Sequence, residues 1–165
     1  MPTAGRTSIG DIINHYKLIS LRLWRRIIMI DIAINYWAVL VAAIVNFVVG
    51  WLWYGPLFGK MWKGLMGMTD ESMKAMAMKP MTAMFWGFVS SLVLAYVLVH
   101  FVVMAGAVGI AGAFSLAFWL WLGFMATQSI GVYLWEGKPF KLFVLCAGYQ
   151  LVATFLAALV LVLWM

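Results

Sequence analysis

The sequence contains few charged residues. Of 165 residues, eleven are Lys or Arg and five are Asp or Glu, which is 10% of the chain. A soluble domain carries about 25% charged residues. With 67% hydrophobic residues and a mean hydropathy of +1.04, the chain has more apolar surface than its own core can bury. This composition excludes a soluble globular protein and predicts a compact integral membrane protein.

Three stretches lack Asp, Glu, Lys and Arg altogether: residues 32–59, 81–135 and 142–165. A helix needs about 20 apolar residues to cross a bilayer core. The middle stretch is therefore long enough for two crossings, and each of the others for one. The runs lack the alternation of a barrel strand, so they predict helices. We expect an all-α fold with four transmembrane helices, at about residues 36–54, 81–104, 113–135 and 140–164, arranged as two tandem helical hairpins.

Residues 1–31 are the polar part of the chain, and they precede a transmembrane domain expected over residues 32–165. Apolar residues such as Ile12, Tyr16 and Ile19 recur at near-helical spacing, with basic residues between them. This pattern predicts a short basic amphipathic helix that rests on the membrane surface. The alternative is that the segment is not part of the functional protein and that Met29 is the natural start. No cleavable signal peptide is evident.

The few basic residues predict an orientation. Six lysines lie in the loops at about residues 55–80 and 136–141, and the loop between the second and third spans has no Lys or Arg. The positive-inside rule therefore places both basic loops in the cytoplasm and both termini outside. The net charge of +6 also favours contact with anionic lipid headgroups. No soluble domain is available for nucleic acid, so we expect no nucleic-acid partner.

Catalytic and cofactor chemistry has little support in the sequence. The one cysteine, Cys146, lies inside the last apolar run, which excludes the thiol-oxidising membrane enzymes that need paired cysteines. No Asp, Glu, Lys or Arg lies in the middle of a span, although such groups usually mark ion pathways and proton relays. A proton-coupled exporter is therefore disfavoured. We expect no enzyme activity and no cofactor.

Weaker candidates for binding remain. His100, late in the second span, is a weak candidate for tetrapyrrole ligation, against an interfacial hydrogen-bonded role. Met73, Met76 and Met78 are weak candidates for Cu(I), because thioethers are soft ligands, but their spacing also suits an interfacial helix. Glu136 is either paired with Lys138 or Lys141 or in contact with a headgroup or substrate.

Several polar residues lie within the predicted spans. They either bond across helices or line a small polar cavity between the hairpins. They are Asn46, Thr127, Gln128, Ser129, Tyr149, Gln150 and Thr154.

Two similar motifs follow the first and third spans. The chain reads W-Y-G-P-L-F-G-K over residues 53–60 and W-E-G-K-P-F-K over residues 135–141. They are either traces of an internal repeat of two hairpins, as in parallel-repeat transporters, or convergent, because Trp favours interfaces and Gly-Pro breaks helices. Gly55-Pro56 is expected to end the first span.

The first motif carries a family resemblance. Its extended form has Gly50, Trp53, Tyr54, Pro56, Phe58, Gly59 and Trp62. This run resembles the signature of a bacterial membrane family catalogued as domain of unknown function 1761. Residues in the second half that resemble the family include Trp135, Glu136, Gly137, Tyr149 and Gln150. The likeness covers about residues 35–164, and it implies four spans in a bacterial inner membrane and no assigned activity.

Two functions are compatible with these features. A non-enzymatic scaffold or accessory subunit of a membrane complex, in a homo-oligomer or a larger assembly, fits the uncharged spans and the small residues of the last one. A small-solute transporter or channel-like protein, built from two hairpins or a dimer, fits the possible repeat and the polar residues Asn46, Gln128 and Gln150. The first function is favoured by the sequence.

Overall fold

The computed structural model describes residues 9–28, 34–69, 71–72 and 78–164. The chain forms two units, residues 1–33 and 34–165. The first unit contains one helix, α1 (Ile9–Ile28). Its described apolar side chains are exposed, among them Ile13 and Tyr16. This helix matches the amphipathic segment that the sequence predicts.

The second unit contains four helices that are long and apolar enough to cross a membrane: Tyr36–Leu57, Pro80–Ala105, Gly109–Trp135 and Phe140–Trp164. The first comprises α2 (Tyr36–Leu52) and the π-helix η1 (Trp53–Leu57), and α3 (Gly59–Met66) follows it. The second is α5 (Pro80–Ala105), and the fourth is α8 (Phe140–Trp164). The third comprises α6 (Gly109–Leu120), the π-helix η2 (Trp121–Ala126) and α7 (Thr127–Trp135). The four predicted transmembrane helices are confirmed by length and composition.

Local sequence explains where the spans begin and end. The backbone N–H groups of Trp37 and Ala38 donate to Asn35 Oδ1 at 3.1 and 3.3 Å, which caps α2. Pro80 lies in the first turn of α5, where a missing N–H costs nothing. Gly106, with φ of 60°, ends α5 in the left-handed conformation.

Gly55-Pro56 does not end the first span, in contrast to the sequence expectation. Pro56 lies inside the π-helix η1, and the helix continues to Leu57. The wider π turn relieves the clash that a proline ring makes in an α-helix. Phe58 N–H donates to the Trp53 carbonyl at 2.9 Å, which closes the turn.

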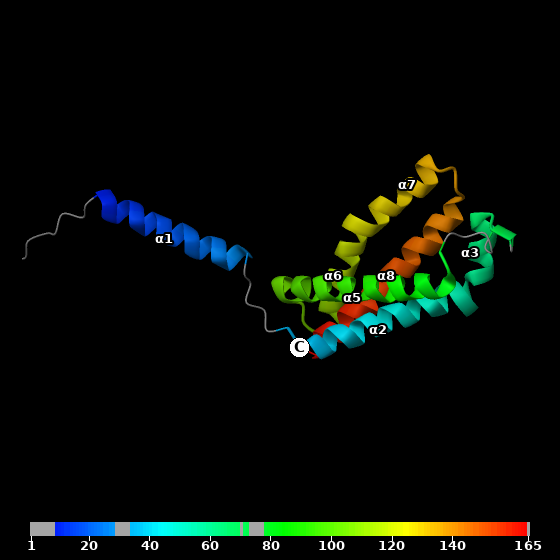
Figure 1. Ribbon diagram of the computed structural model, residues 1–165, viewed down its shortest axis with the longest axis horizontal. Helices are drawn as coiled ribbons and strands as arrows, with labels where there is room; N and C mark the ends of the chain where they lie inside the picture. The colour runs from blue at the N-terminus through cyan, green and yellow to red at the C-terminus, as the bar shows by residue number, and fades with distance from the viewer. Residues whose placement is uncertain (1–8, 29–33, 70, 73–77, 165) are drawn as a thin grey trace, which may run out of the picture. The chain divides into compact units, whose positions relative to one another are not determined.

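The helices pack as two hairpins. α5 packs along α2, and α6 and α7 pack along α8, while α2 and α8 cross at the centre (Figure 1). α5 contacts α6, but among the described helices it makes no comparable contact with α7. Figure 1 shows α7 leaning away from α5. The bundle is therefore closed at one end and open between α5 and α7.

The closed end holds the main core. It comprises the start of α2, the end of α5, the start of α6 and the end of α8, and most of its buried residues are alanines. Small side chains let helix backbones approach closely in a membrane. We call this region the alanine end: Ala38, Val39, Ala42, Ala43, Ala95, Leu98, Val99, Val102, Ala113, Ala117, Ala157, Ala158 and Leu161.

The opposite end carries lysines. α3 and the loop between α7 and α8 meet there, because Lys138 Nζ donates to the Met66 carbonyl at 3.5 Å. Lys60 and Lys63 lie on α3, and Lys141 lies in the first turn of α8. We call this region the basic end: α3 and residues 136–141.

Candidate functional site

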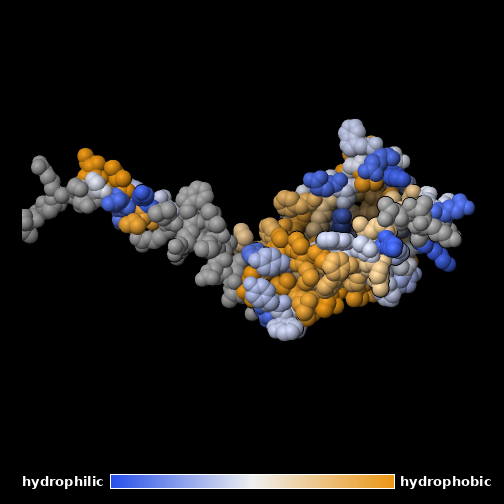
Figure 2. Space-filling model, in the orientation of Figure 1, coloured by the Kyte–Doolittle hydropathy of each residue, from blue (hydrophilic) through white to orange (hydrophobic). Residues whose placement is uncertain are grey.

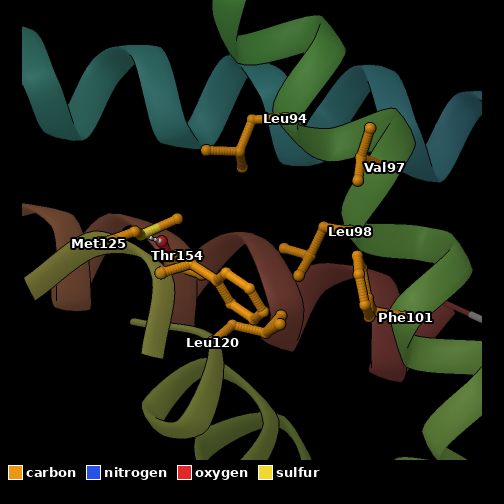
Figure 3. A pocket seen from close by; sticks show the side chains of 8 residues that line it. Leu94, Val97, Leu98, Phe101, Leu120, Met125 and Thr154 are labelled. Atoms are coloured by element: carbon orange, nitrogen blue, oxygen red, sulfur yellow. Dashed lines mark hydrogen bonds between the residues drawn. The ribbon is translucent and has the colours of Figure 1, made fainter. Parts of the chain in front are cut away.

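Three adjoining hollows lie within the four-helix unit. The largest, about 290 Å³, has apolar walls from α5, from α6 with η2, and from α8 (Figure 3). It is lined by Leu94, Val97, Leu98, Phe101, Leu120, Phe124, Met125 and Thr154. In Figure 3 the labelled α5 side chains lie on one side of the space, with Leu120 and Met125 opposite.

The second hollow, about 180 Å³, shares Leu94, Met125 and Thr154 with the first. It has a more polar lining: Asn46, Leu94, Met125, Tyr149, Gln150, Ala153 and Thr154. A third, about 210 Å³, shares Tyr149 with the second and lies between α2 and α5. The three hollows adjoin one another through their shared lining residues, and together we call them the cleft. Figure 2 shows it as a shaded recess in a mostly hydrophobic surface, with hydrophilic atoms at its floor.

The floor of the cleft is a loose polar network. Tyr149 Oη donates to Asn46 Oδ1 at 3.5 Å, and Ser129 Oγ donates to Gln150 Oε1 at 3.1 Å. Thr154 Oγ1 donates to the Met125 sulfur at 3.5 Å, a weak acceptor. Asn46 is only 4% exposed and Thr154 only 2%. No Asp, Glu, Lys, Arg or His lines the second hollow, so its polarity comes from amide and hydroxyl groups.

Gly50 lets Tyr149 reach the floor. A Cβ atom at residue 50 would lie 2.9 Å from Tyr149 Oη. Since real Cβ atoms do not approach other atoms so closely, glycine is what allows the tyrosine ring to pass against α2. Gly50 therefore determines where the polar floor lies between α2 and α8.

The aromatic residues of the first motif form a cluster with Tyr149, next to the place where Tyr149 passes Gly50. Tyr149 stacks edge-on against Tyr54, with ring centroids 5.0 Å apart, and Tyr54 packs against Trp62 at 5.6 Å. Trp53 lies 4.8 Å from Phe58 between centroids. The cluster anchors η1 and α3 on α8. Its η1 and α3 side chains support the cleft, whereas Tyr149 also lines the second and third hollows.

Gly59 makes the turn after η1 possible. A Cβ atom at residue 59 would lie 2.5 Å from the Tyr54 carbonyl oxygen, which is backbone and cannot move aside. Pro56 is exposed in η1. The spacing of the motif is thus explained by a proline-containing π turn closed by a glycine.

The π-helix η2 shapes the wall opposite α5. Trp121 Nε1 donates to the Ala147 carbonyl at 2.7 Å, which ties the start of η2 to α8. Phe124 and Met125, both in η2, line the cleft. π-Helical turns often occur at functional sites because the extra residue re-aims side chains. No feature of the sequence predicted this turn.

Other polar residues from the sequence analysis lie outside the cleft. Gln128 is exposed on α7 and lines none of the three hollows. His100 Nδ1 is 2.7 Å from the Tyr96 carbonyl oxygen, and its ring packs edge-on against Tyr96. Among the described residues, no group of three His, Cys, Asp or Glu side chains could hold a metal ion. Met73 and Met76 lie outside the described residues, and Met78 is exposed.

The second motif has a different local structure from the first. Trp135 ends α7 and is 88% exposed, whereas Trp53 begins a π-helix and is half-buried. Gly137 has φ of 66° in a loop, and Glu136 beside it is exposed. Lys138 donates to the Met66 carbonyl, and among the described residues no ion pair joins it to Glu136. The likeness of the two motifs therefore reflects similar residues at helix ends rather than a repeated turn.

Sequence reasoning missed most of the cleft wall. Leu94, Phe101, Leu120 and Met125 are apolar residues in apolar spans, and nothing in their pattern separates a cleft-lining face from a lipid-facing one. The polar residues gave the only usable signal. Asn46, Tyr149, Gln150 and Thr154 converge on one hollow, whereas Thr127, Gln128 and Ser129 do not line it.

Comparisons with known proteins give a family and no activity. A family model described as "Protein of unknown function (DUF1761)" matches residues 37–162. No curated protein matches the chain. No solved structure matches it either.

Proposed function

We propose a function for this chain, which belongs to the family of proteins of unknown function DUF1761. Its four-helix unit binds a small, weakly polar molecule in the cleft and moves it within the membrane. This is the transporter-like function of the two considered above. The observation that carries it is a polar floor of amide and hydroxyl groups at the bottom of an apolar recess.

Packing supports this proposal. Protein interiors are close-packed, and voids larger than a water molecule are few. Hollows of about 180 to 290 Å³ that share lining residues are a departure from that rule, and ligand sites are typically hollows of this kind with a few convergent polar groups.

The direction of the cleft supports movement as well as binding. Along α5 its lining runs from Met84 to Phe101, which is about 25 Å at 1.5 Å per residue. A hydrocarbon layer is ~30 Å thick. A molecule that moves along the cleft would therefore contact lining side chains over most of the thickness of the apolar layer.

The test is to block the cleft with a folded variant. Ala153 lines the polar hollow, so Ala153→Leu places a larger side chain in it. Ala111 is exposed on α6, so Ala111→Leu adds the same side chain outside. Native mass spectrometry after gentle extraction should find a retained small molecule in the wild type and in Ala111→Leu, and none in Ala153→Leu. Equal retention by all three proteins would contradict the proposal.

An accessory or scaffold role is the second proposal, and α1 favours it. The described apolar side chains of α1, including Ile9, Ile13 and Tyr16, are exposed, so this face needs lipid or a protein partner. The variant Asn46→Leu, at the cleft floor, separates the two functions, and Gln128→Leu, which lies outside the cleft, is its control. Lost assembly with other subunits would favour the scaffold, whereas intact assembly with lost ligand transfer would favour the cleft.

We also propose an orientation in a bacterial inner membrane, with the basic end in the cytoplasm near anionic headgroups. The lysines of α3 and of residues 136–141 lie at one end of the bundle, as the positive-inside rule requires. The C-terminus lies at the alanine end, because α8 begins at the basic end. A C-terminal reporter active only in the cytoplasm would contradict this orientation.

A further inference from the structure

The hydrogen bonds at the cleft floor leave two donors unused. Asn46 uses its side-chain oxygen to accept from Tyr149, and Gln150 uses its own to accept from Ser129. Within the described part of the chain, neither amide nitrogen has an acceptor. Asn46 is more than nine-tenths buried and lines the polar hollow. The floor therefore presents N–H groups toward the space.

Unused donors in a bilayer point to an acceptor that occupies the site. Buried polar groups in proteins are nearly always hydrogen-bonded, and hydrocarbon offers them nothing. The hydroxyl groups of Tyr149, Ser129 and Thr154 already donate within the protein. A ligand head that accepts hydrogen bonds thus fits this floor better than one that must donate them.

The charge of the floor selects the kind of acceptor. The second hollow is lined by no cation, and an anionic head there would lose its hydration without a partner. A carbonyl oxygen accepts hydrogen bonds and carries no net charge. The head group that matches the floor is therefore an uncharged carbonyl.

The largest hollow specifies what is attached to this head. Its lining is apolar apart from Thr154, and it joins the floor at Leu94, Met125 and Thr154. Its outer residues face the lipid, since Phe124 is 69% exposed and Val97 is 46% exposed. A hydrocarbon chain can lie there while its head reaches Asn46, and it can enter sideways from the bilayer.

We propose that the cleft binds a long-chain lipid with an uncharged carbonyl head, held by the amide nitrogens of Asn46 and Gln150. This inference rests on the proposed function and specifies its ligand. A prenylquinone and a fatty acyl ester both supply this chemistry. The ligand enters between α5 and η2, where the bundle is open.

Competition binding with four 18-carbon probes that differ in head group, and with one quinone, tests the head group. Purified full-length protein in micelles of constant composition is equilibrated with tritiated methyl oleate, and decylubiquinone, oleyl alcohol, oleate at pH 8 and 1-octadecene are the competitors. Methyl oleate or decylubiquinone should compete at least about tenfold better than the other three, which is the value of one or two hydrogen bonds. Stronger competition by decylubiquinone identifies a quinone source, and stronger competition by unlabelled methyl oleate identifies an acyl ester.

Three variants test the two donors. Asn46→Leu and Gln150→Leu remove the amide groups, and each should weaken methyl oleate binding about tenfold while 1-octadecene binding stays unchanged. Gln128→Leu makes the same change as Gln150→Leu at an exposed position of α7, and it should bind as the wild type does. If Asn46→Leu does not fold, methyl oleate binding by Gln150→Leu is the test of the amide donors.

The outcomes separate this inference from the proposed function. Competition by oleate, oleyl alcohol or 1-octadecene equal to that of methyl oleate, or wild-type binding by Gln150→Leu, overturns the carbonyl head and leaves the cleft as a site. Binding by Ala153→Leu equal to that of the wild type, or no binding of any probe, overturns the cleft itself.

Discussion

The two ends of the four-helix unit differ in their residues and in how closely their helices pack. At the alanine end, Ala42, Ala95, Ala113 and Ala157 are fully buried, and all four spans contribute to the core. Toward the basic end, α5 and α7 separate and leave a cleft with a polar floor. Small side chains draw backbones together in a membrane, whereas bulky residues and a π turn hold them apart. The close packing at the alanine end therefore determines how the helices are arranged around the cleft.

The largest expected effect comes from the same substitution made at each end. Ala157 and Ala153 lie one turn apart on α8, and Ala157 is fully buried whereas Ala153 borders a hollow of about 180 Å³. Ala157→Leu forces a larger side chain between touching helices, so it should lower the free energy of unfolding by about 3 kcal/mol. Ala153→Leu should cost less than about 1 kcal/mol. Unfolding in mixed micelles measures both, and equal losses would remove the distinction between the ends.

The spans could be predicted from the sequence because their signal is compositional. Charge-free stretches of sufficient length admit few other structures. The face of each span could not be predicted in the same way. A helix such as α5 is apolar all round, so the residues that line the cleft and those that face lipid have the same character. Because the surrounding lipid is as apolar as the protein core, the periodicity of apolar residues does not indicate which face of a span is buried.

Gln128 and Gln150 show how much the polar residues of the sequence can indicate about the position of the cleft. Both lie in predicted spans, and both were candidates for a cavity. The structure places Gln150 at the cleft floor and leaves Gln128 exposed on α7. The difference depends on the register of the third span, which the π-helix η2 shifts before α7 begins. Because this turn has no proline and no other sequence signal, the placement of Gln128 could not be derived.

A smaller effect is expected where the signature motif supports the cleft. Gly59→Ala places a Cβ atom against the Tyr54 carbonyl oxygen, so the turn must open, and the loss of stability should be about 2 kcal/mol. Gly64, in the same short helix α3, has no atom near its Cβ position. Gly64→Ala should raise stability by up to about 1 kcal/mol, because alanine favours a helix. Thermal unfolding of the two variants should therefore shift in opposite directions, and a shared direction would mean that the turn is not under this constraint.

The smallest expected effect concerns the boundary between the two ends, where Tyr149 passes against Gly50. Gly50→Ala brings a methyl group within 2.9 Å of Tyr149 Oη, and a side-chain atom can partly yield, so the cost should be about 1 kcal/mol. Tyr149→Phe removes the atom that clashes. In that background Gly50→Ala should cost almost nothing, and a double-mutant cycle should return a coupling near 1 kcal/mol. If Gly50→Ala costs as much in the Tyr149→Phe protein as in the wild type, Gly50 is required by the helix backbone of α2. The position of Tyr149 would then be set by α8 and not by Gly50.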